Sequence, residues 1–237
     1  MRIRRSIVLV MLAAFAAGAG AEKISGTITI KRHLTHRSVT PAIPVYQRGT
    51  TVKLGKDPQQ DTIGYELARV VIYIEGPELS GDASAAPTQV QVAQLDRRFS
   101  PDLVVVPAGS SVSFPNMDPI FHNIFSLSKP KSFDLGSYDK GDTRVVTFPK
   151  PGIVAVYCHL HPNMQATVVI TPNRWYAQPG SSGEYKLPDL PPGRYTIVAW
   201  HKSAGFFRKT IQVEAGRDVV ANFFIPLEEE SERASIQ

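Results

Sequence analysis

A short loop between two strand-like segments, Cys158–Met164, constrains the fold more than any other part of the chain. Its sequence is Cys-His-Leu-His-Pro-Asn-Met, and Cys158 is the only cysteine among the 237 residues. Thiolate and thioether ligands suit Cu(I), whereas imidazole ligands suit Cu(II). A blue-copper site needs two histidines and one cysteine in a plane, with a methionine as a weak axial ligand. Cys158, His161 and Met164 supply three of these ligands, so the sequence predicts a copper site that a second histidine completes.

The residues on either side of the loop alternate as they do in β-strands. Val154 and Val156 share a face with Cys158, and the even-numbered positions from Met164 to 170 share another. We therefore expect Cys158 and Met164 at the two ends of the loop, with His161 in its middle. Pro162 stiffens the loop just after that histidine. A short, stiff loop between two strands can hold three ligands ready for a metal.

His122 is the predicted fourth ligand. It follows 112–121, which reads as a strand leading into a turn that contains proline. Aromatic and aliphatic neighbours are expected to keep water from the site: Phe114, Ile120, Phe121, Phe125 and Leu160. Such a shell matters because burial and hydrogen bonding at the sulfur tune the redox potential.

Other interpretations of these residues stay open at this point. Cys158 could be an inert buried thiol, Met164 a core residue and His161 a turn residue. Zinc also accepts one cysteine and two histidines, although it has no use for methionine. His159 and His161 form a His-x-His pair, as beside the trinuclear cluster of multicopper oxidases, but six histidines are too few for that cluster. We expect His159 to be a surface imidazole or an electron-exit residue.

The remaining polar residues give no signature of an enzyme. There is no Ser/His/Asp order, phosphate-binding loop or pair of carboxylates, and we expect no catalytic activity. His33 and His36 read as solvated loop residues, and His201 as the end of a strand. Three aspartates read as turn residues: Asp118, Asp134 and Asp139.

Most other segments favour an all-β fold. Apolar residues make up 43% of the chain, and 17 glycines and 19 prolines are spread along it, as is typical of many short strands and turns. No segment beyond the N-terminus has helical periodicity, and 31–66 reads as a long loop. We expect strands at 24–30, 69–75, 89–95, 103–106, 111–114, 144–148, 153–158, 166–171, 183–200 (two strands and a turn), 206–213 and 218–225.

The N-terminus has the pattern of an export signal. Arg2, Arg4 and Arg5 precede an apolar stretch that is too short to span a bilayer, and small residues end at Ala21 before Glu22. Removal of 1–21 would take away three arginines and lower the net charge from +5 to +2. No basic patch with interleaved aromatic residues indicates nucleic-acid binding. We expect a periplasmic or secreted protein with no membrane span in its mature chain; an uncleaved membrane anchor is the alternative.

The ordered ligand pattern in 89–172 resembles that of the cupredoxins: Phe-Pro-Asn-x-Asp from Phe114, His-Asn at His122, then Cys-x-x-His-x-x-Met. The loop is most similar to that of amicyanin. The resemblance implies a Greek-key β-sandwich with one type 1 copper held by His122, Cys158, His161 and Met164. It also implies supporting roles for four neighbours of these ligands: Asn116, Asn123, Pro162 and Phe114. His159 departs from the pattern, because amicyanins have a non-ligand polar residue there.

The flanking segments resemble a smaller, transthyretin-type sandwich of the carboxypeptidase-regulatory-like kind. The resemblance rests on Gly26–Ile28, Arg69–Glu75 and Gly183–Tyr195, and flanks of this kind accompany methylamine-utilisation-like proteins. The predicted organisation is a signal peptide, two parts of the smaller sandwich around a cupredoxin domain, and an acidic tail: 1–21, 22–88, 89–172, 173–226 and 227–237.

These resemblances predict an exported blue-copper protein that carries single electrons to or from a redox partner protein. Two alternatives remain: a periplasmic copper carrier or storage protein, and an envelope interaction module in which copper is structural. Rapid copper exchange, or binding beyond one equivalent through His33, His36 and His159, would indicate the carrier. Equal partner binding by metal-free and copper-loaded protein would indicate the interaction module.

Overall fold

The structure is a computed structural model that describes residues 22–32, 34, 63–76, 79 and 87–226. Within these residues the chain is almost entirely β, so the predicted fold class is confirmed. The exception is a short helix, α1 (Ile63–Leu67), which lies in a segment predicted to be a loop. Among the described residues, no helix is long and apolar enough to cross a membrane. The predicted signal peptide, the acidic tail, His33 and His36 lie outside them.

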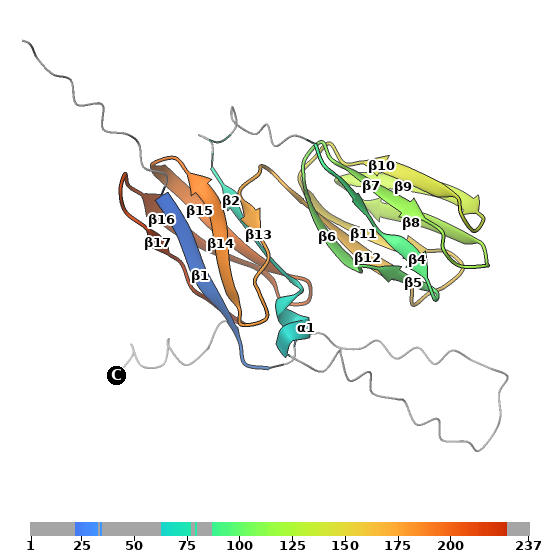
Figure 1. The fold of residues 1–237 in the computed structure, drawn as a ribbon, viewed down its shortest axis with the longest axis horizontal. Helices are drawn as coiled ribbons and strands as arrows, with labels where there is room; N and C mark the ends of the chain where they lie inside the picture. The colour runs from blue at the N-terminus through green and yellow to red at the C-terminus, as the bar shows by residue number, and fades with distance from the viewer. Residues whose placement is uncertain (1–21, 33, 35–62, 77–78, 80–86, 227–237) are drawn as a thin grey trace, which may run out of the picture.

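Two sheets form a first sandwich from segments at both ends of the described chain (Figure 1). One sheet has the order β14 (Glu184–Leu190), β1 (Glu22–Ile30) and β17 (Val219–Val220), with β18 (Phe223–Ile225) also paired to β1. The other has the order β13 (Tyr176–Ala177), β2 (Val70–Glu75), β15 (Gly193–His201) and β16 (Gly205–Val213). Alternate residues such as Ile24, Ile72 and Ile197 are fully buried in the core of this sandwich.

A second sandwich is built from the residues between β2 and β13. Its smaller sheet has the order β10 (Thr143–Thr147), β7 (Ser111–Pro115) and β3 (Gln89–Gln91). Its larger sheet has the order β6 (Leu103–Pro107), β12 (Gln165–Thr171), β11 (Gly152–Cys158), β8 (His122–Ser128) and β9 (Lys131–Tyr138). A hairpin of β4 (Ala93–Leu95) and β5 (Arg98–Ser100) completes it. This sandwich has its own core, which includes Cys158 and Met164.

The strand predictions are wrong at four places in the second sandwich. The predicted strand 89–95 is split into β3 and β4, and the predictions missed β5, β8 and β9. In β8 the buried positions include His122 and Ser126, so polar residues hide the alternation. In β9 most residues are exposed or only partly buried, so the strand lacks a strong apolar pattern. Asp134, predicted to be a turn residue, lies in β9.

An apolar interface joins the two sandwiches. Val71, Tyr73, Val198 and Trp200 from β2 and β15 pack against the outer face of the larger sheet of the second sandwich. That face contributes Leu103 and Val169, with partly buried neighbours at Val105 and Ile153. The two sandwiches therefore bury apolar surface against each other and should support each other's stability.

Charged residues reinforce the same junction. Buried Arg69, just before β2, forms an ion pair with Asp102, just before β6, and the Nζ atom of Lys202 lies 4.0 Å from the same carboxylate.

His201 ends β15 as predicted and is fully buried, with Nε2 3.1 Å from a carboxylate oxygen of buried Glu66. Burial lowers the pKa of His201, and the neighbouring Glu66 opposes that shift.

We expect Trp200→Ala to uncouple the two sandwiches. Removing a large buried aromatic side chain destabilises a domain by about 3–5 kcal/mol, and this one lies between two cores. Calorimetry should show one cooperative transition for the natural chain and two separate transitions for the variant. Phe206→Ala is the matched control, because Phe206 is 47% exposed and should change the unfolding temperature little. A single transition at an unchanged temperature in Trp200→Ala would contradict this account.

Candidate metal centre

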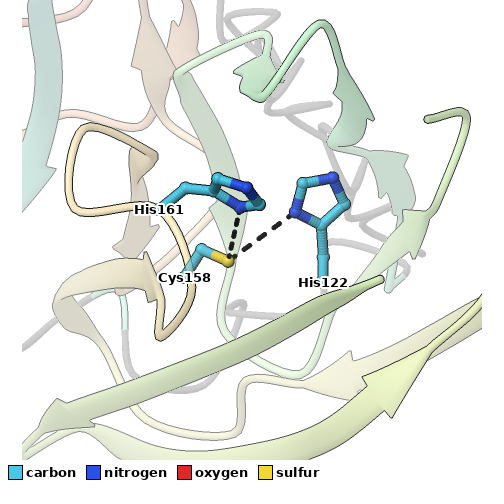
Figure 2. Close-up of side chains that lie close together, drawn as sticks. All are labelled: His122, Cys158 and His161. Atoms are coloured by element: carbon cyan, nitrogen blue, oxygen red, sulfur yellow. Dashed lines mark hydrogen bonds between the residues drawn. The ribbon is translucent and has the colours of Figure 1, made fainter. Parts of the chain in front are cut away.

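Three elements of the second sandwich bring the predicted ligands together (Figure 2). His122 is the first residue of β8, Cys158 is the last residue of β11, and His161 lies in the loop that follows. Antiparallel pairing of β8 with β11 matches Ile124 to Cys158, which places the His122 end of β8 beside the cysteine. All three side chains converge although His122 is 36 residues from Cys158 in sequence.

The donor atoms have the spacing that one metal ion requires. The Cys158 Sγ atom is 3.7 Å from His122 Nδ1 and 3.6 Å from His161 Nδ1, and all three donor atoms lie within 4.8 Å of one another. Metal–sulfur and metal–nitrogen bonds of about 2.3 Å and 2.0 Å, at angles from tetrahedral to trigonal, would separate sulfur and nitrogen by about 3.5–3.7 Å. The residues therefore fit a metal bound by one thiolate and two imidazoles.

Met164 closes the ligand loop immediately before β12. Its side chain is buried, with 1% exposed, in the same core cluster as Cys158. The Met164 amide donates to the His161 carbonyl at 2.9 Å, and the Cys158 amide donates to the Met164 carbonyl at 3.3 Å. These bonds bring the two ends of the loop together, as the alternating pattern predicts. Pro162 sits within this loop, next to His161.

Asn123 connects the two ligand-bearing strands through its backbone. Its carbonyl accepts a hydrogen bond from the His159 amide at 3.0 Å, so β8 is tied to the start of the ligand loop. Its side-chain Oδ1 atom is buried and has no partner among the described residues. The supporting role that the family resemblance implies for Asn123 is thus a main-chain hydrogen bond to the ligand loop.

The predicted apolar shell is only partly correct. Phe114 is fully buried, and Phe125 is partly buried. Ile120, Phe121 and Leu160 are 40%, 56% and 54% exposed. They belong to loops at the ligand end of the sandwich, and none of the described strands covers them. These three side chains are therefore available to another molecule.

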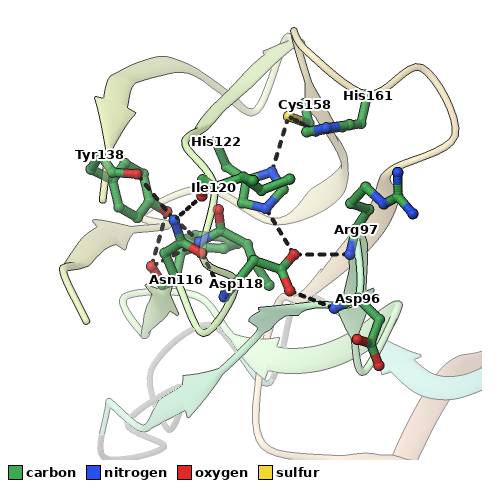
Figure 3. A network of polar contacts seen from close by, with 11 residues as sticks. Asp96, Arg97, Asn116, Asp118, Ile120, His122, Tyr138, Cys158 and His161 are labelled. Atoms are coloured by element: carbon green, nitrogen blue, oxygen red, sulfur yellow. Dashed lines mark hydrogen bonds and ion pairs between the residues drawn. The ribbon is translucent and has the colours of Figure 1, made fainter. Parts of the chain in front are cut away.

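Asp118 supports the centre, and the sequence analysis missed this role. One carboxylate oxygen lies 2.9 Å from His122 Nε2 and also accepts the Arg97 amide at 2.8 Å; the other accepts the Asp96 amide at 2.7 Å (Figure 3). Because His122 turns Nδ1 toward the sulfur, Nε2 carries the proton and donates to Asp118. A carboxylate in this position fixes the orientation of a ligand imidazole and raises its basicity. In the sequence, only the spacing of four residues between Asp118 and His122 could have indicated this contact.

The same carboxylate stabilises a strained turn. Asp96 and Arg97 form the two-residue turn between β4 and β5, with φ angles of 53° and 55°. Positive φ values are unfavourable for residues other than glycine, and this turn type usually contains glycine or asparagine. Burial opposes ionisation of Asp118, but hydrogen bonds from Arg97, His122 and Asp96 outweigh it and lower its pKa. Asp118 thus couples the β4–β5 hairpin to the orientation of His122.

Asn116 fixes the turn that precedes His122. It is fully buried, and its side-chain amide donates to the carbonyls of Ile120 at 2.8 Å and Tyr138 at 3.1 Å. Its side-chain oxygen accepts the Asp118 amide at 2.9 Å. Asn116 therefore positions Asp118, which in turn positions His122.

The charge state of the partly buried His161 suits metal binding. Burial lowers its pKa, and the nearby His122 and Arg97 lower it further, although Asp118 acts in the opposite direction. At neutral pH the imidazole is therefore uncharged and can donate its Nδ1 lone pair.

His159 lies on the surface, as expected. Its ring stacks on Phe125 with centroids 3.8 Å apart, and Nε2 is 3.5 Å from a carboxylate oxygen of Asp134. The imidazole is 48% exposed, and it belongs to the loop that follows β11.

Comparison with known proteins indicates the family of the chain. No protein-family model matches the chain. Amicyanin-alpha of Methylorubrum extorquens is 30% identical over 92 residues, which are 38% of this chain and 76% of that protein. The chain belongs to the amicyanin family of cupredoxins. A blue-copper electron carrier is therefore its function at the level of the family.

Solved structures of copper proteins are also similar to part of this cupredoxin. Amicyanin from Paracoccus versutus matches with a TM-score of 0.33 and 21% identity over 42% of this chain and 96% of that one. A copper-containing nitrite reductase, NirK from Thermus scotoductus, matches with a TM-score of 0.33 and 25% identity over 35% of this chain. The match spans 22% of the length of the nitrite reductase chain.

We expect Asp118→Asn to weaken Cu(II) binding by the cupredoxin. Loss of a partner that orients a ligand histidine typically lowers metal affinity by about 10–100-fold. A less basic His122 should also favour Cu(I) and raise the reduction potential. Competition titration with a chelator and voltammetry measure the two effects. Asp134→Asn is the matched control, because Asp134 is paired with His159, which is not a predicted ligand. Unchanged affinity and potential in Asp118→Asn would contradict the role assigned to Asp118.

Proposed function

We propose that this protein carries single electrons by means of one type 1 copper, held by Cys158, His122 and His161 with Met164 as the weak axial ligand. The observation that carries the proposal is the convergence of one sulfur and two Nδ1 atoms within 4.8 Å. The buried Met164 in the same core favours copper over zinc, because zinc has no use for a thioether. Copper bound there would supply reversible one-electron chemistry between Cu(I) and Cu(II).

The protein contributes a rigid frame for these ligands. Hydrogen bonds between Met164, His161 and Cys158 close the loop, and the Asp118 carboxylate orients His122. The core around Cys158 is packed with fully buried side chains such as Phe114 and Val156. A site fixed in this way changes little in geometry between oxidation states, so the reorganisation that accompanies electron transfer stays small.

His161 is the proposed point of contact with a redox partner protein. Its ring is partly buried, and exposed Leu160 precedes it in the loop. Exposed Phe121 precedes the other histidine ligand, and Ile120 is exposed beside it. An apolar surface of this kind excludes water when a partner docks and allows close approach to the imidazole edge.

We also propose that the chain is exported through its N-terminal segment and acts in the periplasm or outside the cell. The arginine-rich start and apolar stretch of 1–21 support this proposal. The first sandwich would serve as a support fixed to the electron carrier, because apolar contacts and the Arg69–Asp102 ion pair join the two. Its kinship with the carboxypeptidase-regulatory-like domains, and the division of 22–226 into an inserted and a split domain, stay predictions.

Substitution of the two sulfur ligands gives a direct test. One equivalent of Cu(II) should give the natural chain an intense visible band from thiolate-to-copper charge transfer, which a mild reductant bleaches. Cys158→Ser should abolish the band. Met164→Leu, which conserves volume in the core, should keep the band and raise the reduction potential, because the axial ligand tunes it.

Absorption spectra and voltammetry of the natural chain, Cys158→Ser and Met164→Leu distinguish the proposed function from its alternatives. A full-strength band in Cys158→Ser would rule out the proposed ligand set. Stoichiometric copper binding without a visible band, with rapid transfer to a chelator, would instead indicate a copper carrier. Thermal unfolding of each variant checks that the fold is intact.

A further inference from the structure

A buried histidine and a buried glutamate meet at the corner of the first sandwich where α1 leads into β2 and β15 ends (Figure 1). His201 and Glu66 are both fully buried. His201 Nε2 is 3.1 Å from one carboxylate oxygen of Glu66, and the other oxygen accepts the Leu34 amide at 3.0 Å. Both oxygens act as acceptors, as those of an ionised carboxylate do. The proposed electron carrier makes no use of this pair.

The turn between β15 and β16 fixes which ring nitrogen of His201 carries the proton. Nδ1 lies 3.1 Å from the amide nitrogens of both Ser203 and Ala204. An amide N–H donates, so Nδ1 accepts both bonds and carries no proton. Nε2 then carries the ring proton and donates it to Glu66. The neutral imidazole thus has a partner at each nitrogen, and it closes the turn.

A protonated His201 does not fit this arrangement. An imidazolium carries hydrogen on both nitrogens, and the second hydrogen would point at two N–H donors. Protonation therefore breaks both bonds that close the turn and places a positive charge in a buried site. Burial lowers the pKa of His201 most; the Glu66 carboxylate acts in the opposite direction, and the nearby Arg69 lowers it further.

The turn that His201 closes also carries a contact to the second sandwich. Lys202, the next residue, donates its amide to the Arg69 carbonyl at 3.2 Å, and its Nζ atom lies 4.0 Å from the Asp102 carboxylate. Arg69 forms an ion pair with the same carboxylate. The Asp102 carbonyl accepts the Thr167 amide of β12 at 2.9 Å, so this aspartate is fixed to the second sandwich. A change in the turn therefore reaches the junction between the sandwiches.

Five residues form what we call the corner cluster: Glu66, Arg69, Asp102, His201 and Lys202. Among the described residues, they bring together the charges from α1, from the start of β2, from the turn itself and from the second sandwich. With a neutral His201 the cluster holds two cations and two carboxylates. Protonation adds a third cation, so charge repulsion adds to the loss of the two turn bonds.

We propose that His201 is a pH-sensitive latch between the two sandwiches, and that its protonation opens the latch. Opening frees the β15–β16 turn, weakens the contacts of Lys202 and Arg69 with Asp102, and lets water reach the interface around Trp200. None of the five residues is a predicted metal ligand, so this inference does not rest on the proposed function.

The pH range of the latch follows from linkage. An imidazole in the open corner has an ordinary pKa of about 6.5, whereas the closed corner lowers the pKa of His201. The open state therefore binds the proton more readily than the closed state. The latch is closed above about pH 6.5, and the open fraction grows by up to about tenfold for each pH unit below that value, until the closed state is protonated too.

NMR spectra of the full chain from about pH 8 to about pH 5 span the ordinary histidine pKa and test the latch. Long-range proton–nitrogen correlations should show a proton on Nε2 of His201 alone at neutral pH. Hydrogen exchange of the Ser203 and Ala204 amides, corrected for its intrinsic pH dependence, should accelerate as His201 titrates. The indole signal of Trp200 should change with the same midpoint. Trp175 is the internal control, because it is fully buried in the core of the first sandwich.

His201→Asn removes the titration and keeps an acceptor for the turn, since the asparagine oxygen can take the place of Nδ1. This variant loses the bond to Glu66 and is less stable, so its pH dependence is compared rather than its stability. Its corrected exchange rates at Ser203 and Ala204 should not vary with pH. His159→Asn is the matched control, because it removes an imidazole that is 48% exposed in the second sandwich and should leave the pH dependence unchanged.

The contrary results are equally specific. A proton on Nδ1 of His201 at neutral pH, or corrected exchange without pH dependence in the natural chain, would overturn the latch. An equal pH dependence in His201→Asn would do the same. If the signals of Trp175 and Trp200 change together, acid unfolds the first sandwich as a whole, and the latch is also wrong. If His201→Asn does not fold, the tautomer and the two indole signals of the natural chain still decide.

Discussion

The pairing of β11 with β8 and β12 is the constraint on which the rest of the centre depends. It places Cys158 at the end of a central strand, beside the end of β8 that carries His122. The loop that carries His161 joins β11 to its other neighbour, β12. The donor atoms meet because strand register fixes the backbone positions, and fully buried residues on the inner face of β11, Val154 and Val156, secure that register. A shift of one residue would turn Cys158 to the outer face and remove the ligand from the site.

Side-chain contacts outside the ligand set then refine the geometry. Asn116 fixes the turn before β8, Asp118 accepts from His122, and the same carboxylate stabilises the positive φ values of Asp96 and Arg97. The orientation of a ligand on β8 is therefore tied to a hairpin more than 20 residues away in sequence. This arrangement explains why a residue that binds no metal should change the affinity and the potential.

The sequence could predict what depends on local spacing. Period-2 alternation located most strands. The Cys-x-x-His-x-x-Met order, together with His122, identified candidate ligands, and the structure brings His122, Cys158 and His161 together. For Met164 the structure shows only that its side chain is buried in the same core as Cys158. Contacts between distant segments could not be predicted. Asp118 looked like a turn residue because its partners are backbone amides of another hairpin, and β8 was missed because His122 and Ser126 occupy core positions. The interface between the sandwiches was also hidden, since Ile153 and Val169 read only as strand residues.

X-ray absorption at the copper K-edge of the Cu(II)-loaded protein tests the central claim most directly. The account predicts one short copper–sulfur distance from Cys158 and two copper–nitrogen distances from His122 and His161, with the sulfur contribution lost in Cys158→Ser. Copper surrounded only by nitrogen and oxygen ligands in the natural chain would contradict it.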